Sequence, residues 1–291
     1  MKKFSVLVMT LLLLCLPSIN LKAGEPAPDN NKAYRNLGFS YYKLGKYHEA
    51  IADFSKAIEL NPKDDTAYLL RGFAYYALGK CDEAIADFSK IIERNSKELL
   101  LYCKRGDTYY ALGKYNEAVL DFSKAIELSP QEVFLYGKRG DAYYALGKYN
   151  EAIADFSKII ERNPENAVVY NYRGYLYDAI GRHHEAMIDY GKAIELDPDI
   201  PYPYKHLGVN YNRLGRYDDA IRHLNKAIDL SPMYADAYYA RAHSYSMTSN
   251  IKRAVQDLRN AVRIKPALRD DAKTDKYFDN MRNIPAFKRL I

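Results

Sequence analysis

The sequence predicts an all-α solenoid of seven antiparallel helix pairs with a C-terminal capping helix. The first observation behind this fold class is a repeat: residues 137–160, GKRGDAYYALGKYNEAIADFSKII, recur 34 residues earlier as CKRGDTYYALGKYNEAVLDFSKAI. The second is that each 34-residue unit shows helical apolar periodicity twice, on either side of a Gly-Lys or Gly-Arg pair. Because one helix pair cannot bury its apolar face alone, neighbouring pairs are expected to stack.

Recurring small and aromatic residues indicate how each unit packs. The seven units follow one another from Asn31, and a position is counted from the first residue of its unit. Position 11 is tyrosine and position 20 is alanine in all seven units, and position 24 is aromatic in the first five. Position 8 is glycine in the first six units and alanine, Ala242, in the last. A glycine inside a helix costs about 1 kcal/mol relative to alanine, so its repetition predicts a close helix contact. Glycine at position 15 is expected to end the first helix at positive φ, and proline marks the end of the second helix in six units.

The Tyr-x-x-x-Gly-x-x-Tyr pattern resembles the tetratricopeptide repeat, and the resemblance covers residues 31–268. It implies a right-handed α-solenoid. The expected repeats are 31–64, 65–98, 99–132, 133–166, 167–200, 201–234 and 235–268. The segment 269–291 is expected to cap the last repeat, with an amphipathic helix over 270–283, because a terminal repeat needs a polar outer cover.

One polar pairing is predicted inside the repeats. Position 7 is arginine and position 23 is aspartate in repeats 2, 3, 4, 5 and 7. Repeat 6 has neither, with Leu207 and His223, and repeat 1 has Leu37 and an unmatched Asp53. This matching predicts an ion pair between the two helices of a repeat, which we expect to fix their register rather than add much stability.

The N-terminus predicts export. Residues 1–23 combine a basic start, an apolar core and a small residue, Ala23, before a cleavage point, as in a bacterial signal peptide. Residues 24–30 are expected to form a disordered linker. The expected location is periplasmic or extracellular; the alternative is that residues 1–23 anchor the chain to the membrane. Of the three cysteines, Cys81 and Cys103 lie outside this leader. They are expected to be free, because their heights along the helix axes differ by more than the Cα–Cα distance that a disulfide allows.

Several functions are disfavoured. Without residues 1–23 the chain has 40 basic and 37 acidic residues, and their interspersion is not typical of a nucleic-acid surface. The Gly-Lys pairs lack the spacing and the preceding strand of a P-loop. No nucleophile with its base and no set of metal ligands emerges. We therefore expect a non-catalytic protein with no cofactor, no metal and no membrane span in the mature chain.

The resemblance also implies a binding surface. In the tetratricopeptide family the first helices line a concave groove, which suits an extended or helical peptide with tyrosines as anchors. The expected partner-binding residues are Arg35, Phe39, Tyr42, Phe73, Tyr76, Asp107, Tyr110, Asp141, Tyr144, Asn171, Tyr175 and Lys205. Equally open is that the position-12 tyrosines only cover their own helix pairs. The paired Lys and Asn with which some relatives clamp a carboxylate are absent from positions 5 and 9.

The expected function is a protein–protein interaction scaffold for envelope or periplasmic assembly. The alternative is a structural solenoid that self-associates and has no peptide ligand. The identity of the protein partner is not indicated by the residues.

Overall fold

A computed structural model describes residues 30–291. The predicted signal peptide 1–23 and the linker up to residue 29 lie outside the described residues. The chain divides into two compact units, and the boundary along the sequence lies between Leu78 and Gly79. Each unit is described by itself below.

Both units are built from helices joined by short turns, and the predicted all-α solenoid of helix pairs is confirmed. The first unit contains α2 (Asn30–Lys43), α3 (Tyr47–Leu60) and α4 (Asp65–Ala77). The second begins with α5 (Cys81–Arg94), α6 (Leu99–Ala111), α7 (Tyr115–Leu128), α8 (Val133–Ala145), α9 (Tyr149–Arg162), α10 (Ala167–Ala179) and α11 (His183–Leu196). It continues with α12 (Pro201–Arg213), α13 (Tyr217–Leu230), α14 (Ala235–Met247), α15 (Ile251–Ile264), α16 (Leu268–Thr274), the 3₁₀ helix η1 (Lys276–Met281) and α17 (Pro285–Lys288).

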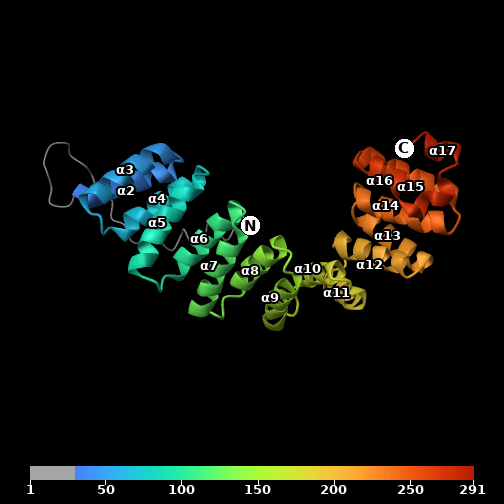
Figure 1. The fold of residues 1–291 in the computed structure, drawn as a ribbon, viewed down its shortest axis with the longest axis horizontal. Coiled ribbons are helices and arrows are strands. Elements are labelled where there is room, and N and C mark those ends of the chain that lie inside the picture. Colours follow the sequence, from blue (N-terminus) through green and yellow to red (C-terminus); the bar gives the residue numbers. More distant parts are fainter. Residues whose placement is uncertain (1–29) are drawn as a thin grey trace. The chain divides into compact units, whose positions relative to one another are not determined.

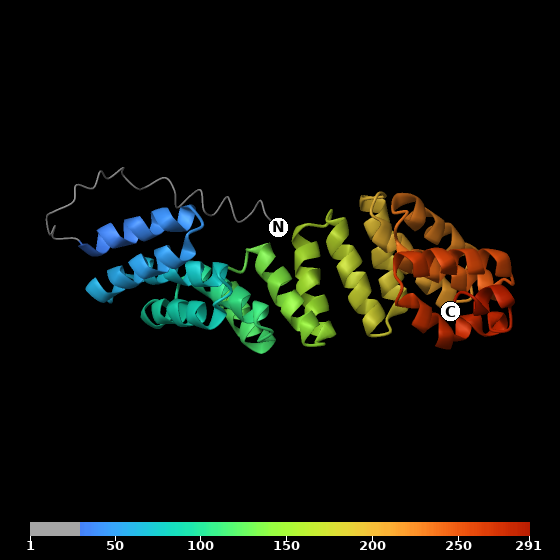
Figure 2. The same ribbon diagram turned by 90° about the horizontal axis from the view of Figure 1, so that it is seen from above.

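In the second unit, consecutive helices pack on one another in chain order, and Figures 1 and 2 show the pairs side by side. The first helices of neighbouring repeats also touch, as α10 does with α12 and α12 with α14. This leaves the array with two sides. We call the surface formed by α6, α8, α10, α12 and α14 the first-helix face. We call the surface formed by α7, α9, α11, α13 and α15 the second-helix face.

The recurring glycines have the two roles that their positions predicted. The glycine at position 15 adopts φ between +71° and +79° in six repeats, where it ends the first helix. In repeat 7 this place is taken by Ser249, with φ +58°, a conformation that an L-residue adopts at a cost. At position 8, a Cβ on Gly106 would lie 2.7 Å from the Phe122 ring, so only glycine lets the two helices approach this closely. The position-20 alanines are fully buried in every repeat.

The ion pair predicted between positions 7 and 23 is confirmed in repeats 3, 4, 5 and 7. In each, the guanidinium donates two hydrogen bonds of 2.7–2.9 Å to the aspartate. The pairs are Arg105–Asp121, Arg139–Asp155, Arg173–Asp189 and Arg241–Asp257. The pair predicted in repeat 2, Arg71 with Asp87, spans the two units and stays a prediction.

Each of these arginines also reaches the preceding repeat, which the sequence reasoning did not anticipate. Its Nη1 donates to the position-25 side chain, a serine or, before repeat 7, Asn225, at 2.6–3.1 Å. In the first unit Arg71 makes the same bond to Ser55. The arginine therefore ties three helices together rather than two.

Repeat 1 shows what happens when the arginine is missing. Oδ2 of Asp53 is buried and has no hydrogen-bond partner within the described part of the chain. Leu37, at the arginine's position, leaves this carboxylate unpaired, and burial raises the pKa of Asp53.

The C-terminal segment is helical but not as one helix over 270–283. It forms α16, η1 and α17, with a break at Asp275, where ψ is 118°. The break has a physical reason: the Asp275 carboxylate accepts hydrogen bonds from the Tyr277 N–H (3.0 Å) and the Tyr239 hydroxyl (3.0 Å) and lies 2.8 Å from Nε2 of His243. Phe278, Met281 and Phe287 are fully buried and cover the end of repeat 7.

Candidate functional site

Three tyrosines on the first-helix face form a row that is only partly covered. Tyr110, Tyr144 and Tyr175, which we call the tyrosine row, are 37%, 42% and 41% exposed. Tyr110 and Tyr144 each pack against the first tyrosine of the following second helix, with ring centroids 5.2 and 5.8 Å apart. Tyr110 and Tyr144 thus cover their own helix pairs with one part of the ring and leave the other part to solvent.

The tyrosine row is connected along the array. Tyr144 and Tyr175 meet edge to face at 6.0 Å, and their hydroxyl oxygens are 3.4 Å apart. This hydrogen bond is the main reason that the pKa of Tyr144 is raised. Burial, with smaller contributions from Asp141, Tyr115 and Tyr144, raises the pKa of Tyr110. The phenols of Tyr110 and Tyr144 are therefore neutral hydrogen-bonding groups at neutral pH.

Two predicted acidic residues lie beside this row. Asp107 accepts a 2.6 Å hydrogen bond from Nζ of Lys138, so its charge is compensated within the array. Desolvation raises the pKa of Asp141, and the charge of Lys138 opposes this effect. Lys138 thus joins repeats 3 and 4 and was not among the predicted residues.

The row leads to two polar groups without adequate partners. Oδ1 of Asn171 is buried and accepts no hydrogen bond from any described residue. Nζ of Lys205 is 3.2 Å from Nδ1 of His206, and none of the described carboxylates forms an ion pair with it. Burial lowers the pKa of Lys205, although Asp236 and Asp178 oppose this. Lys205, which is only partly buried, can therefore still pair with an acidic group of a ligand.

Tetratricopeptide repeat models match residues 40–79, 106–143 and 210–249, with further matches at 66–97, 133–166, 167–200 and 235–268. Together these cover most of the chain. The chain belongs to the tetratricopeptide repeat family. Because this family works through binding protein or peptide partners, the chain is a protein–protein interaction scaffold with a fold typical of non-catalytic proteins.

Solved structures agree on the fold. A tetratricopeptide repeat protein from Parabacteroides merdae is 20% identical, covers 83% of this chain and 96% of its own, and has a TM-score of 0.59. A structure of MamA is 26% identical, covers 56% of this chain and 96% of its own, with a TM-score of 0.53. YrrB, described as a tetratricopeptide protein with an unusual peptide-binding site, is 23% identical over 62% of this chain and 92% of its own, with a TM-score of 0.51. No curated protein sequence matches.

The remaining predicted residues of this tetratricopeptide protein lie in the first unit. Arg35 is held by the buried Asp64, with both carboxylate oxygens within 2.9 Å of Nη1, so its guanidinium has a structural partner. The Phe39 ring lies under Lys43, and Tyr42 packs edge to face on Tyr47 at 5.4 Å. Burial of Tyr42, followed by the effect of Tyr47, raises its pKa. From α4, Tyr76 is exposed and Phe73 is half-buried.

Sequence reasoning missed a buried polar centre at the end of the tyrosine row. Asp178 accepts hydrogen bonds from the Tyr190 hydroxyl (2.9 Å) and from Nδ2 of Asn210 (2.8 Å), and it also contacts His183 and Arg213. His206 stacks on Tyr190, and burial lowers its pKa to about 3, so this imidazole is neutral. The sequence contained a signal for this centre. In repeat 5, Asp178 replaces the position-12 tyrosine of the preceding repeats, and Tyr190 replaces their position-24 phenylalanine.

Three other chemical features of residues 30–291 bear on function. None of the described helices is long and apolar enough to cross a bilayer. In the same range, His, Cys, Asp and Glu side chains do not gather in threes as a metal site requires. Cys81 and Cys103 are both free, and burial raises the pKa of the Cys103 thiol to about 12. Cys103 is thus an unreactive core residue.

Proposed function

We propose that this tetratricopeptide protein binds an extended segment of a protein partner along the first-helix face of its second unit. One observation carries the proposal. The partly exposed tyrosine row continues from Tyr175 to His206, whose neighbour Lys205 forms no ion pair with a described carboxylate. In the family's terms, this face is the concave groove.

The tyrosines supply the apolar part of the binding. A tyrosine offers a large ring at low cost in conformational entropy, and such residues dominate binding energies in many interfaces. The edge-to-face contact between Tyr144 and Tyr175, and the packing of Tyr110 on Tyr115, hold the rings before a partner arrives. Side chains that are already ordered lose less entropy on binding, so the row is suited to anchor a peptide.

Lys205 supplies direction and specificity. Nζ of Lys205 is 3.2 Å from Nδ1 of His206 and forms no ion pair with the described carboxylates. A partially buried ammonium without a counter-charge favours a carboxylate in the partner. We therefore expect the bound segment to place aromatic or aliphatic side chains on the tyrosine row and an acidic residue near Lys205.

The compartment is part of the same proposal. The basic start, apolar core and Ala23 of residues 1–23 support export, so the partner is sought among periplasmic, envelope or extracellular proteins. N-terminal sequencing of the mature protein from fractionated cells tests this. A chain that begins near residue 24 supports cleavage, and an intact N-terminus in the membrane fraction supports an anchor.

Affinity purification from an envelope extract, followed by mass spectrometry, tests the binding face. The variant Tyr110→Ala/Tyr144→Ala/Tyr175→Ala is expected to lose the partners that the wild type captures. The matched control is Leu120→Ala/Met233→Ala, which truncates two exposed apolar side chains away from the row. Equal capture by the triple variant and the wild type would overturn the proposal. Loss of capture by the control as well would point to a different surface.

A further inference from the structure

The near balance of basic and acidic side chains in the chain as a whole conceals an uneven distribution. Residues 251–291, which comprise α15 and the C-terminal segment, contain 11 basic and five acidic side chains. Residues 24–250 contain 29 basic and 32 acidic ones. Figure 1 shows α15 and α16 together at the end of the second unit. The net positive charge of the chain after residue 23 therefore lies in this end of the array.

Two positions of the repeat reverse their charge on α15. Position 19 is acidic in the first six repeats and is Arg253 in the seventh. Position 29 is likewise acidic in the first six repeats and is Arg263 in the seventh. The outer surface of α15 is therefore basic, whereas the other second helices carry charges of both signs.

The basic side chains of α15 lie along its solvent side. Lys252, Gln256, Arg259 and Arg263 are spaced by three or four residues, so they share one face of the helix, and all four are exposed. Arg253 is exposed beside Lys252. We call Lys252, Arg253, Arg259 and Arg263 the basic row. At 1.5 Å per residue, this row extends for about 16 Å along the helix.

The charges of the basic row are not compensated within α15. The one acidic residue of the helix, Asp257, is buried and bound by Arg241, so its charge is already paired. Lys265, which follows the helix, is bound by Asp236 and adds nothing to the excess. Within residues 30–291, the members of the row take part in none of the ion pairs. Four positive charges therefore remain on one helix.

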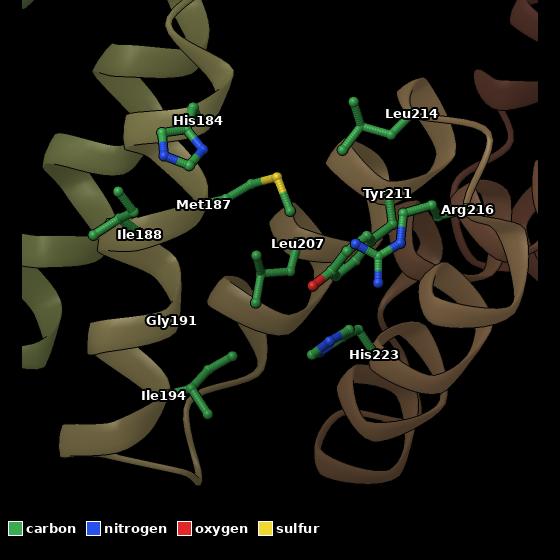
Figure 3. Close-up of a pocket in the computed structure, with 10 residues that line it drawn as sticks. All are labelled: His184, Met187, Ile188, Gly191, Ile194, Leu207, Tyr211, Leu214, Arg216 and His223. Atoms are coloured by element: carbon green, nitrogen blue, oxygen red, sulfur yellow. The ribbon is translucent and has the colours of Figure 1, made fainter.

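The neighbouring elements do not offset this excess. Residues 216–230, which include α13, contain three basic and three acidic side chains. Among them, Arg216, which lines the hollow between α11, α12 and α13 shown in Figure 3, donates to Asp219 at 2.6 Å. The short helix α16 contains two basic and two acidic side chains, and residues 275–291 contain four basic and two acidic ones. The surroundings of the basic row are therefore neutral or basic.

Two members of the row lie where a helix disfavours positive charge. Lys252 and Arg253 fall in the first turn of α15, whose free backbone N–H groups give this end a partial positive charge. Each of the other second helices has an acidic residue in its first turn, as α7 has Glu117, and α15 has none. The Tyr245 ring, 5.6 Å from the guanidinium, accounts for Arg253 in part. A basic residue that does not stabilise its own helix is typical of one retained for binding.

The composition of the row indicates an extended anionic surface as the partner. Protein interfaces are anchored by aromatic and apolar side chains, but none of the large apolar residues of 251–291 is exposed. Arginine binds phosphate groups through two N–H groups at once, and several arginines in a row can hold several phosphates. Clusters of four or more lysines and arginines on one side of a helix are typical of binding to anionic lipid headgroups.

We propose that the basic row of α15 binds the anionic surface of a lipid bilayer through the phosphates of its headgroups. The contact is peripheral, because the exposed side of the helix carries charged and polar side chains only. The basic row lies on the second-helix face and shares no residue with the tyrosine row. The bilayer is therefore a partner in addition to the bound protein segment, and its binding can be tested without knowing that segment.

Flotation with lipid vesicles tests this site. The probe is a vesicle made of equal amounts of phosphatidylglycerol and phosphatidylcholine, and the neutral control is phosphatidylcholine alone. The protein begins at residue 24, because the apolar residues 1–23 would bind membranes by themselves, and it contains every described residue. It is expected to float with the anionic vesicles only, and less so as added salt screens the charges. Failure to float with anionic vesicles at low salt would overturn the proposal.

Charge reversal then places the site. Arg253→Glu/Arg263→Glu restores the acidic residues of the other repeats, so it should fold, and it is expected to weaken vesicle binding about tenfold or more. The control Lys124→Glu/Lys158→Glu makes the same change in net charge at exposed sites on α7 and α9 and should float like the wild type. Equal binding by the two double variants would contradict the proposal. Arg253→Glu alone should also raise the melting temperature, which loss of a structural residue would lower.

Other anionic partners give distinguishable results. If a second copy is the partner, sedimentation equilibrium will show self-association that Arg253→Glu/Arg263→Glu abolishes, while vesicles do not bind. If a nucleic acid is the partner, a labelled DNA duplex will bind in fluorescence polarisation at a salt concentration at which the vesicles do not. If an acidic protein segment is the partner, labelled polyglutamate will bind under those conditions instead. Each of these results would overturn the assignment of the basic row to a lipid surface.

Discussion

The guanidinium of Arg139 donates hydrogen bonds of 2.9 and 2.7 Å to the two carboxylate oxygens of Asp155, sixteen residues later in the same repeat. A third bond, of 3.1 Å, joins it to Ser123 of the preceding repeat. One side chain therefore fixes α8 relative to both α7 and α9. The side chain of Asp155 is 4% exposed and that of Arg139 is 20% exposed, so the pair is largely shielded from water.

Arg139→Leu is expected to lower the free energy of unfolding by about 2 kcal/mol, because it leaves the Asp155 carboxylate buried without its partner. Urea unfolding followed by circular dichroism measures this, with hydrogen exchange to show whether the loss is local to α7, α8 and α9. Arg139→Leu/Asp155→His copies repeat 6 and should recover part of the loss. A single variant as stable as the wild type would mean that the pair has no structural role.

Leu37→Arg is expected to raise the free energy of unfolding by about 1 kcal/mol at pH 7, because it gives the unpaired Oδ2 of Asp53 a charged donor. The effect should depend on pH. Burial raises the pKa of Asp53 in the wild type, so its contribution to stability is present below about pH 4 and is lost as the pH rises through the folded pKa.

The new guanidinium should reverse this sign by lowering the pKa of Asp53. Thermal unfolding at pH 3, 5 and 7 is therefore expected to show a small difference between variant and wild type at pH 3 and the full gain at pH 7. Leu37→Gln, which adds polarity without charge, serves as the control. A gain that does not change with pH would contradict the proposed pairing.

Much of the fold could be predicted because its causes are local and repeated. Position-8 glycines pack against position-24 rings, and the glycines in the turns adopt positive φ. Arg105 and Asp121 form the ion pair that the matched residues at positions 7 and 23 predicted. The third bond of each arginine was missed because it joins different repeats. The break at Asp275 was missed because it depends on His243 and Tyr239, which are distant in sequence.

Asp275 should make attachment of the C-terminal segment sensitive to acid. Burial alone raises the pKa of Asp275, but the hydrogen bond and charge of His243, with bonds from Tyr277 and Tyr239, lower it to about 2. A lowered carboxyl pKa stabilises the folded state above about pH 4, and this stability is lost as the pH falls toward 2.

Hydrogen exchange of residues 268–291 is expected to accelerate between pH 4 and about 2 in the wild type, after correction for the intrinsic rate. Asp275→Asn should already exchange faster at pH 6 and show little further change on acidification. The control is Asp270→Asn, which removes an exposed carboxylate from the same segment. Identical profiles for Asp275→Asn and the wild type would contradict a role of this carboxylate in attachment.

Lys205→Met is expected to make the free protein more stable and its binding weaker, which is typical of a residue retained for function. Burial lowers the pKa of Lys205, so the charged form costs stability at pH 7, and this cost disappears as the pH rises toward about 10. Thermal unfolding at pH 7 and pH 10 should therefore show a gain for the variant that shrinks at pH 10. Reduced stability at pH 7 would contradict this account.

The candidate site was predictable in part. Tyr110 and Tyr144 at position 12 and Tyr175 at position 9 occupy positions that line the family's groove, and the structure leaves all three partly exposed. The lack of partners at Asn171 and Lys205 could not be read from the sequence, because it depends on which side chains reach them. Arg35 was expected at the binding face, yet a buried carboxylate in the next inter-repeat turn, Asp64, holds its guanidinium.

The most direct test of partner binding at the first-helix face is photo-cross-linking. p-Benzoylphenylalanine is placed at residue 144, in the tyrosine row, and separately at residue 120, an exposed position on α7 of the second-helix face. Both proteins are irradiated with the envelope extract from which the wild type captures its partner. The account predicts that the partner is cross-linked from residue 144 and not from residue 120. Cross-linking from residue 120 alone would contradict it.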